Sequence, residues 1–133
     1  MAKLNIFISQ PIHDLSEREI LAERDRIEEV LHKLFPDDEL TFLSGYTSEE
    51  AHFKDENQER IYRLGCSIQV LSEADYIFLP NYYGDAHECV VEAHVANEYN
   101  VPIIKEITSS FCCRGDEKIR NTYMINNFGG NRV

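Results

Sequence analysis

The sequence contains no tryptophan and only 2 methionines. No hydrophobic run in it approaches the roughly 18 residues that a membrane-spanning helix needs. The opening stretch "MAKLNIFISQP" lacks a long apolar segment followed by a small-residue cleavage site, so no signal peptide is expected. These absences predict a cytoplasmic protein with no membrane partner. The 133 residues, 43% of them hydrophobic, are nevertheless sufficient for one domain with its own core.

Basic residues are also scarce. The chain has 13 Lys and Arg residues against 24 Asp and Glu residues, which gives a net charge of −11. A nucleic-acid-binding surface needs clustered Lys and Arg, so no nucleic-acid partner is expected. The acidic balance favours solubility and still permits a small anionic ligand that a few local donors hold.

Cysteine is sparse and is not arranged for metal binding. The 4 cysteines form no C-x-x-C pair, and no spacing of Cys and His is typical of a zinc site. The stretch "HECVVEAH" differs from the H-E-x-x-H motif, and it separates His87 from His94 by two helical turns without a third ligand. We expect reduced thiols, no metal and no cofactor.

Hydrophobic periodicity predicts alternating strands and helices. The clearest helix carries Ile20, Ile27 and Leu31 at helical spacing and begins with a capping box of Ser16 and Glu19. Gly65 interrupts another helical pattern, which suggests close packing or a break near a ligand. Strands are expected at residues 3–9, 39–43, 75–80 and 101–107, helices at 16–35, 59–74 and 85–99, and a polar loop at 44–57.

This order predicts an α/β fold, a flavodoxin/Rossmann-like three-layer sandwich with a mostly parallel sheet of four or five strands. Residues 1–110 are expected to form the domain. Residues 111–133, where the pattern decays, are expected to be an extension that is either helical or docked on a partner subunit. If the strand order is 2-1-3-4, ligands bind where the loops 9–14 and 80–85 meet, beyond the ends of the first and third strands. The first turns of the helices that follow these loops would favour an anion there.

Glu92 is the residue that the pattern explains least well. It lies between Val91 and Ala93 in the third expected helix, where packing favours an apolar side chain. One interpretation places it at the rim of the sheet-packing face, or in a pair with a nearby Lys or Arg. The other makes it a carboxylate in a partly apolar pocket, acting as a nucleophile or as an acid or base.

The loop before this helix offers further candidates. Asp85 suits a helix cap, and it also suits a second carboxylate near Glu92, as glycosidic bond chemistry uses. Tyr82 and Tyr83 are either ordinary surface aromatics or residues that flank a flat ligand such as a base. The candidate substrate-binding residues at the ends of the first and third strands are Ser9, Gln10, Pro11, Tyr82, Tyr83 and Gly84.

Three stretches together resemble one known family. They are "IFISQPIHDLSEREILAERDRIEEVL", "LGCSIQVLSEADYIFLP" and "YYGDAHECVVEAHVANEYNVPII", which cover most of residues 3–107. They resemble the nucleoside 2-deoxyribosyltransferase-like superfamily and, within it, the DUF4406 branch of small bacterial and phage proteins. The pattern C-x-x-E-x-x-x-A after a Gly-Asp loop carries much of this resemblance.

The resemblance implies a flavodoxin-like fold, a homodimer or higher homo-oligomer, and action on the N-glycosidic bond of deoxynucleosides or their 5′-monophosphates. It implies that Glu92 attacks the anomeric carbon, that Asp85 contacts sugar or base, and that the loop 9–14 lines the pocket. The chain has Phe7 and Ser67 where transferases of this family carry an aromatic hydroxyl and an aspartate.

Two functions are therefore expected. The first is an enzyme acting on the N-glycosidic bond of a nucleoside or nucleotide, either a deoxyribosyltransferase or an N-hydrolase, with Glu92 as nucleophile and Ser67 among the substrate-binding residues. The alternative is a non-catalytic module of bacterial or phage origin that binds or senses a nucleotide, which would account for the departures from the family pattern.

Overall fold

The computed structural model describes residues 2–45, 53–81, 84, 86–113 and 116–126. They form one five-stranded sheet in the order β2-β1-β3-β4-β5, in which the first four strands are parallel and β5 is antiparallel to β4. The predicted α/β sandwich and the predicted order of the first four strands are confirmed. The strands are β1 (Lys3–Ile8), β2 (Glu39–Leu43), β3 (Tyr76–Leu79), β4 (Ile103–Cys113) and β5 (Asp116–Asn126), and the helices are α1 (Glu17–Leu34), α2 (Glu56–Leu71) and α3 (His87–Glu98).

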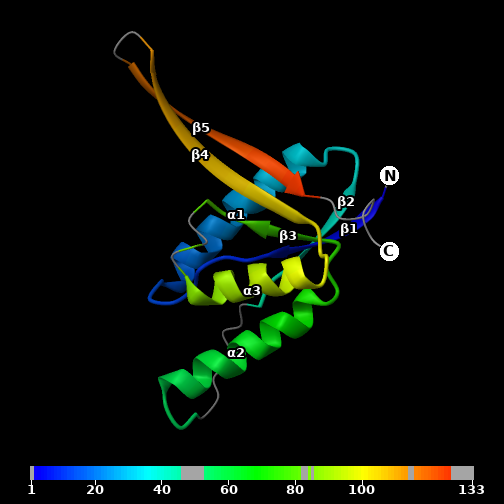
Figure 1. Ribbon diagram of the computed structural model, residues 1–133, viewed down its shortest axis with the longest axis vertical. Coiled ribbons are helices and arrows are strands. Elements are labelled where there is room, and N and C mark those ends of the chain that lie inside the picture. The colour runs from blue at the N-terminus through cyan, green and yellow to red at the C-terminus, as the bar shows by residue number, and fades with distance from the viewer. Residues whose placement is uncertain (1, 46–52, 82–83, 85, 114–115, 127–133) are drawn as a thin grey trace.

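Helices cover both faces of the sheet, so the domain has three layers (Figure 1). On one face, Ile27 and Leu31 of α1 pack into a buried cluster with Ile6, Ile8 and other strand residues. The opposite cluster joins residues of α2 and α3 to the other side of the same strands. Successive residues of β1 therefore point to opposite cores, as the period of two in a strand requires.

The helix ends follow from local sequence. Ser16 and Glu19 form the predicted capping box of α1. Asn100, with a φ of 58°, ends α3 in a left-handed cap, in which the N–H of Val101 donates to the carbonyl oxygen of Ala96 at 2.9 Å. The N-cap position of α3 is occupied by Ala86 instead of Asp85, which itself lies outside the described residues. Within the described ranges, no helix is both long enough and apolar enough to cross a membrane.

The chain after Thr108 is the main departure from the predicted structure. A helix was one of two expectations for residues 111–133, but the described part of that range belongs to β4 and β5. Residues 103–113 pair with residues 116–126 along their whole length, and only residues 103–105 of β4 also pair with β3. The two strands therefore continue as a long ribbon past the rest of the sheet (Figure 1). The boundary expected at residue 110 falls inside β4.

Candidate active site

The candidate site lies at the carboxyl ends of β1 and β3, the predicted switch point of the strand order. The chain leaves β1 at Ser9, whose N–H donates to the carbonyl oxygen of Phe78 in β3 at 3.1 Å. β2 lies on the other side of β1, so chain connections diverge here and leave space above the strands. Side chains from the loop after β1, from α2 and from α3 meet in that space.

Glu92 of α3 is held there by two serine hydroxyls. Its side chain is buried, with the residue 5% exposed. Ser9 Oγ donates to Glu92 Oε1 at 2.7 Å, and Ser67 Oγ of α2 lies 2.7 Å from Glu92 Oε2. None of the salt bridges found among the described residues includes Glu92, which counts against a pair with a nearby Lys or Arg. The residue instead lines a cavity.

Ser67 has a second partner, which limits where protons can lie. Its Oγ is also 2.9 Å from the carbonyl oxygen of Leu64, one turn earlier in α2. A hydroxyl has a single proton, so it cannot donate fully to both Leu64 and an ionised Glu92. If Glu92 is protonated, its own proton serves Ser67 and the Ser67 proton serves Leu64. The same geometry therefore accommodates both protonation states of Glu92.

Burial governs the acidity of this group of residues. Desolvation raises the pKa of Glu92, and the neighbouring carboxylate of Glu88 raises it further, while the bonds from Ser67 and Ser9 lower it. Burial likewise raises the pKa of the adjacent Cys89 thiol to about 12, despite its hydrogen bond with Ser9. Cys89 is therefore a neutral thiol and not a nucleophile near neutral pH. Glu92 is the buried group whose charge can change.

Glu92 and Ser67 line a cavity of about 230 Å³. Ligand sites for drug-sized molecules measure about 300–1,000 Å³, so this space suits a small molecule. Its walls come from the loop after β1, the start of the loop after β2, one face of α2 and the first turns of α3. The predicted loop 9–14 thus contributes Gln10, Ile12, His13 and Asp14.

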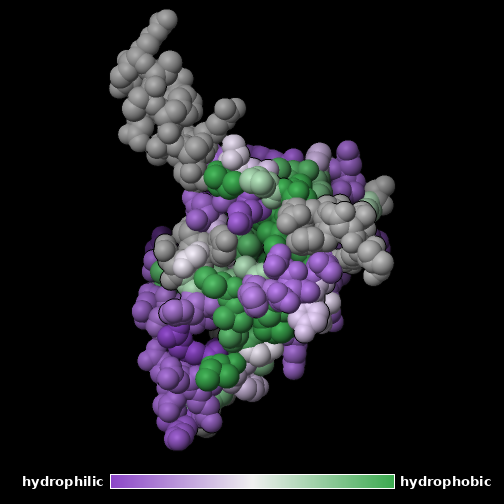
Figure 2. Space-filling model, viewed as in Figure 1, coloured by the Kyte–Doolittle hydropathy of each residue, from purple (hydrophilic) through white to green (hydrophobic). Residues whose placement is uncertain are grey.

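Ion pairs form much of the wall. Arg60 of α2 lies 2.7 Å from Glu88 of α3, and Arg63 pairs with Glu59 within α2 at 3.1 Å. His13 lies 3.4 Å from Asp14 and 3.5 Å from a carboxylate at the start of α2. Figure 2 shows hydrophilic residues covering the part of the surface where α2 begins. The apolar floor near Phe7 therefore meets a charged rim.

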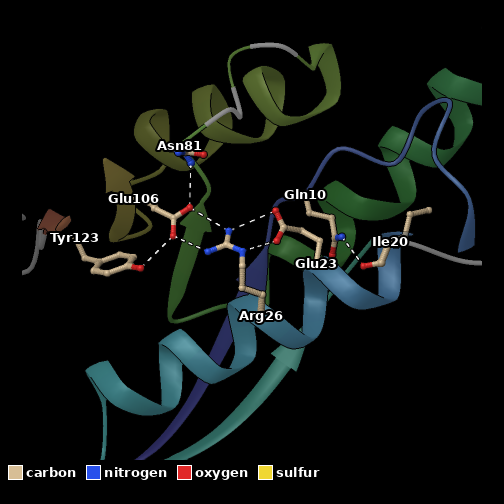
Figure 3. Close-up of polar contacts among 7 residues, drawn as sticks. All are labelled: Gln10, Ile20, Glu23, Arg26, Asn81, Glu106 and Tyr123. Carbon is tan, nitrogen blue, oxygen red and sulfur yellow. Dashed lines mark hydrogen bonds and ion pairs between the residues drawn. The ribbon is translucent and has the colours of Figure 1, made fainter. Parts of the chain in front are cut away.

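Gln10, a residue of the cavity wall, carries an amide oxygen without a described hydrogen-bond partner. Its residue is 8% exposed, and its Nε2 donates to the carbonyl oxygen of Ile20 at 2.8 Å (Figure 3). Its Oε1 is buried and has no hydrogen-bond partner among the described residues. Buried polar atoms in native proteins are nearly always paired, so this oxygen is an exception within the described residues.

Gly65 and Gly45 differ in how closely their surroundings approach them. Gly65 was expected to mark close packing or a break near a ligand. A Cβ added there would meet no described atom within 4 Å, and α2 continues through this position without a break, so both expectations are wrong. The close approach occurs at Gly45 after β2, where an added Cβ would lie 2.0 Å from Cβ of Ser67. Gly45 therefore lets the loop after β2 pass directly against the serine that holds Glu92.

A second polar cluster lies on the opposite face of the sheet (Figure 3). Glu106 of β4, 2% exposed, accepts two hydrogen bonds from Arg26 of α1 at 3.0 and 3.1 Å. Its oxygens also accept from Tyr123 Oη of β5 and from the N–H of Asn81. Burial raises the pKa of Glu106, but these partners outweigh it and hold that pKa below its usual range. The cluster joins α1 to the strand ribbon.

The structure thus brings together Ser9, Gln10, Ser67 and Glu92 of the predicted site residues. Pro11 is half-buried and Gly84 is exposed, and neither is among the residues found to line the cavity. Tyr82, Tyr83 and Asp85, and the contacts predicted for them, lie outside the described residues. Apart from Ser67, sequence reasoning missed the residues on the cavity face of α2. A signal was available in the helical spacing that places Glu56, Glu59, Arg60 and Arg63 on the same side as Ser67.

Comparison with models of known protein families finds no match, and comparison with curated proteins finds none either. Across the described ranges, no three His, Cys, Asp or Glu side chains group so as to hold a metal ion.

Proposed function

We propose that the protein cleaves or exchanges the N-glycosidic bond of a nucleoside or nucleotide. The observation that carries this proposal is the buried carboxyl group of Glu92, held at both oxygens and facing a small cavity at the switch point of the sheet. A carboxylate fixed in an apolar floor is the group that glycosidic chemistry uses as a nucleophile.

The proposed step uses Glu92 in its ionised form. One carboxylate oxygen attacks the anomeric carbon of the sugar, and the carbon–nitrogen bond breaks with its electron pair passing to the base, which then takes up a proton. Water, or a second free base, next attacks the same carbon and releases the carboxylate. Water gives hydrolysis, and a base gives transfer.

Neighbouring side chains have distinct roles in this scheme. Ser9 and Ser67 orient the carboxyl group, and Gln10 contributes to the wall of the cavity. Asp85 is proposed to orient the substrate or to manage protons, and Tyr82 or Tyr83 to flank the base. The resemblance of the C-x-x-E-x-x-x-A stretch to nucleoside 2-deoxyribosyltransferases supports the same choice of Glu92.

A non-catalytic binding module is the second candidate, and one observation favours it. The bond between Ser67 Oγ and the Leu64 carbonyl oxygen suits a protonated Glu92, and burial raises the pKa of that group. A neutral carboxyl group donates and accepts hydrogen bonds well but attacks carbon poorly. In this case the cavity would sequester or sense a nucleotide-like ligand.

We also propose a cytoplasmic homodimer or higher homo-oligomer. Free Cys66 and Cys89 suit a reducing compartment. Ile61 of α2, 71% exposed, and Val91 of α3, 39% exposed, leave apolar surface beside each other on a groove between the two helices. Light scattering across a range of protein concentrations tests the assembly, and a monomer at every concentration would contradict it.

Chromatography of reaction mixtures tests the proposed function. The protein is incubated with deoxynucleosides, ribonucleosides and their 5′-monophosphates, each with and without a second free base. Release of free base identifies a hydrolase, and appearance of the exchanged nucleoside identifies a transferase. Thermal stabilisation by a ligand, with no product at high enzyme concentration, would instead support the binding module.

A further inference from the structure

We infer that the cavity selects an uncharged nucleoside and discriminates against its 5′-monophosphate. The inference rests on the proposed function and narrows its substrate class. It is carried by the charges of the described cavity wall, by the pairing of those charges, and by the residues at the helix starts.

Carboxyl groups outnumber basic groups on the described wall. Five carboxyl groups line the cavity, against the guanidinium groups of Arg60 and Arg63 and the imidazole of His13. If His13 and Glu92 were both protonated, four carboxylates would still face three cations. The described wall is therefore net negative in every protonation state near neutral pH, and it repels a dianionic phosphate at short range.

The basic groups of this wall are already engaged by carboxylates. Arg60 donates to Glu88 from two nitrogens, at 2.7 and 3.0 Å, and Arg63 donates to Glu59 at 3.1 Å. A bound phosphate would have to share or displace these partners. Displacement would leave the carboxylates close to the phosphate without their cations, so the geometry opposes the exchange.

The helix starts, which usually attract anions, carry acidic side chains here. The sequence suggested that the first turns of α1 and α3 would favour an anion, but Glu19 lies in the first turn of α1 and Glu88 in that of α3. The first turn of α2 carries Glu56 and Glu59, and Asp55 caps it. These carboxylates already compensate the positive helix ends, so little attraction is left for a phosphate.

Matched pairs of substrates test the inference. For the four common 2′-deoxynucleosides and their 5′-monophosphates, KM and ligand-induced thermal shift are measured at low and at physiological salt. We expect each nucleoside to bind about tenfold or more tightly than its monophosphate at low salt. This ratio of nucleoside affinity to monophosphate affinity should fall as salt screens the charges of the wall.

A charge-neutralising variant provides the second arm. Glu56→Gln with Glu59→Gln removes two negative charges from the rim, so the ratio should fall several-fold toward unity. Asp37→Asn with Glu73→Gln removes the same charge from exposed positions that do not line the cavity, and should leave the ratio unchanged. An equal effect of both variants would show that net charge alone, and not the rim, sets the preference.

The outcomes separate this inference from the proposed function. Turnover of monophosphates as efficiently as nucleosides would overturn the inference and leave N-glycosidic chemistry standing. Tight binding of nucleosides without any turnover would support the inference and count against the enzyme. Neither binding nor turnover of any member of the panel would overturn both.

Discussion

The hydroxyl oxygen of Ser67 lies 2.7 Å from Oε2 of Glu92, so α2 reaches across the cavity to hold the carboxyl group presented by α3. On the resemblance proposed above, Ser67 would take the position at which transferases of that family carry an aspartate. An aspartate at this point would place a second negative charge beside Glu92, whereas a serine hydroxyl can donate to Glu92 or accept from it. The state of Glu92 in this chain thus depends on Ser67, Ser9 and burial.

Ser67→Ala should lower activity and shift its pH dependence. The hydrogen bond from Ser67 lowers the pKa of Glu92, so its removal raises that pKa further. Less of the ionised nucleophile is then present at a given pH, and the acidic limb of the kcat/KM profile moves to higher pH. Loss of one bond to a charged group corresponds to about tenfold to hundredfold in rate near neutral pH.

Ser72→Ala is the matched control for this change. Ser72 follows the same helix and is exposed, and its Oγ lies 2.6 Å from the carbonyl oxygen of Gln69 three residues earlier, as Ser67 Oγ lies 2.9 Å from that of Leu64. Removal of the Ser72 hydroxyl should not shift the pH dependence of kcat/KM. An unshifted profile in Ser67→Ala would show that the hydroxyl does not control Glu92.

Glu92→Gln should make the protein more stable at neutral pH. Burial raises the pKa of Glu92 above its ordinary value of 4.5, so the folded state disfavours the ionised form. The unfolding free energy of the wild type therefore decreases as pH rises from 4.5 through the raised pKa. The decrease is about 1.4 kcal/mol for each pH unit between the two pKa values. A neutral amide can donate to Ser67 and avoids this loss.

Urea denaturation of both proteins between about pH 4 and 8 checks this sign. The gap between Glu92→Gln and the wild type should open with rising pH. Glu98→Gln, at an exposed position of the same helix, controls for removal of one negative charge. A wild type that is more stable than Glu92→Gln throughout this range would contradict the account of a penalised buried carboxylate.

Arg26→Met should destabilise the fold without direct effect on the cavity. The change removes the main partner of Glu106, whose side chain is 1% exposed, and costs about 2 kcal/mol or more because a buried carboxylate loses its cation. Arg24→Met is the control, since its partner Glu28 is 31% exposed and such a pair contributes about 0.5 kcal/mol.

Low pH should reduce the difference in stability cost between Arg26→Met and Arg24→Met. The lowered pKa of Glu106 means that its contribution to stability is present above its ordinary pKa of 4.5 and is lost as pH falls through the lowered value. Denaturation at several pH values therefore tests the cluster, and equal costs for Arg26→Met and Arg24→Met at neutral pH would contradict it.

Alanine at the two glycines should act in opposite directions. At Gly65, exposed in α2, alanine meets no described atom and should stabilise the helix by about 0.5–1 kcal/mol. At Gly45 the new Cβ would collide with Ser67, so the protein should lose about 2 kcal/mol, together with activity as Ser67 is displaced. Thermal melts of both variants compare the two sites, and equal shifts would contradict the close approach at Gly45.

Local sequence signals account for most of the sheet and helices. Apolar spacing and the Ser16–Glu19 capping box predict α1, and the alternation of strands with helices predicts a parallel sheet. The position of Glu92 among apolar residues marked it as unusual before its partners were known. A local pattern does not show that Ser9 and Ser67 hold its carboxyl group, because these residues are 83 and 25 positions away in the chain.

Other features depend on tertiary pairing that a local pattern does not contain. Residues 116–126 form β5 because β4 offers them an open edge, although their polar composition shows no strand period. The ion pair between Arg60 and Glu88 joins two helices, and its two residues each look like ordinary solvated positions in sequence. The pairing of Glu106 with Arg26 across layers was missed for the same reason.

The rate of base release by the wild type and by Glu92→Gln tests the central claim most directly. Each protein is incubated with the best substrate of the nucleoside panel, and free base is followed by chromatography, with circular dichroism confirming that both are folded. The account predicts release by the wild type and a loss of about 10³-fold or more in Glu92→Gln, because the amide cannot form the bond to the sugar. Release at the same rate by both proteins would contradict it.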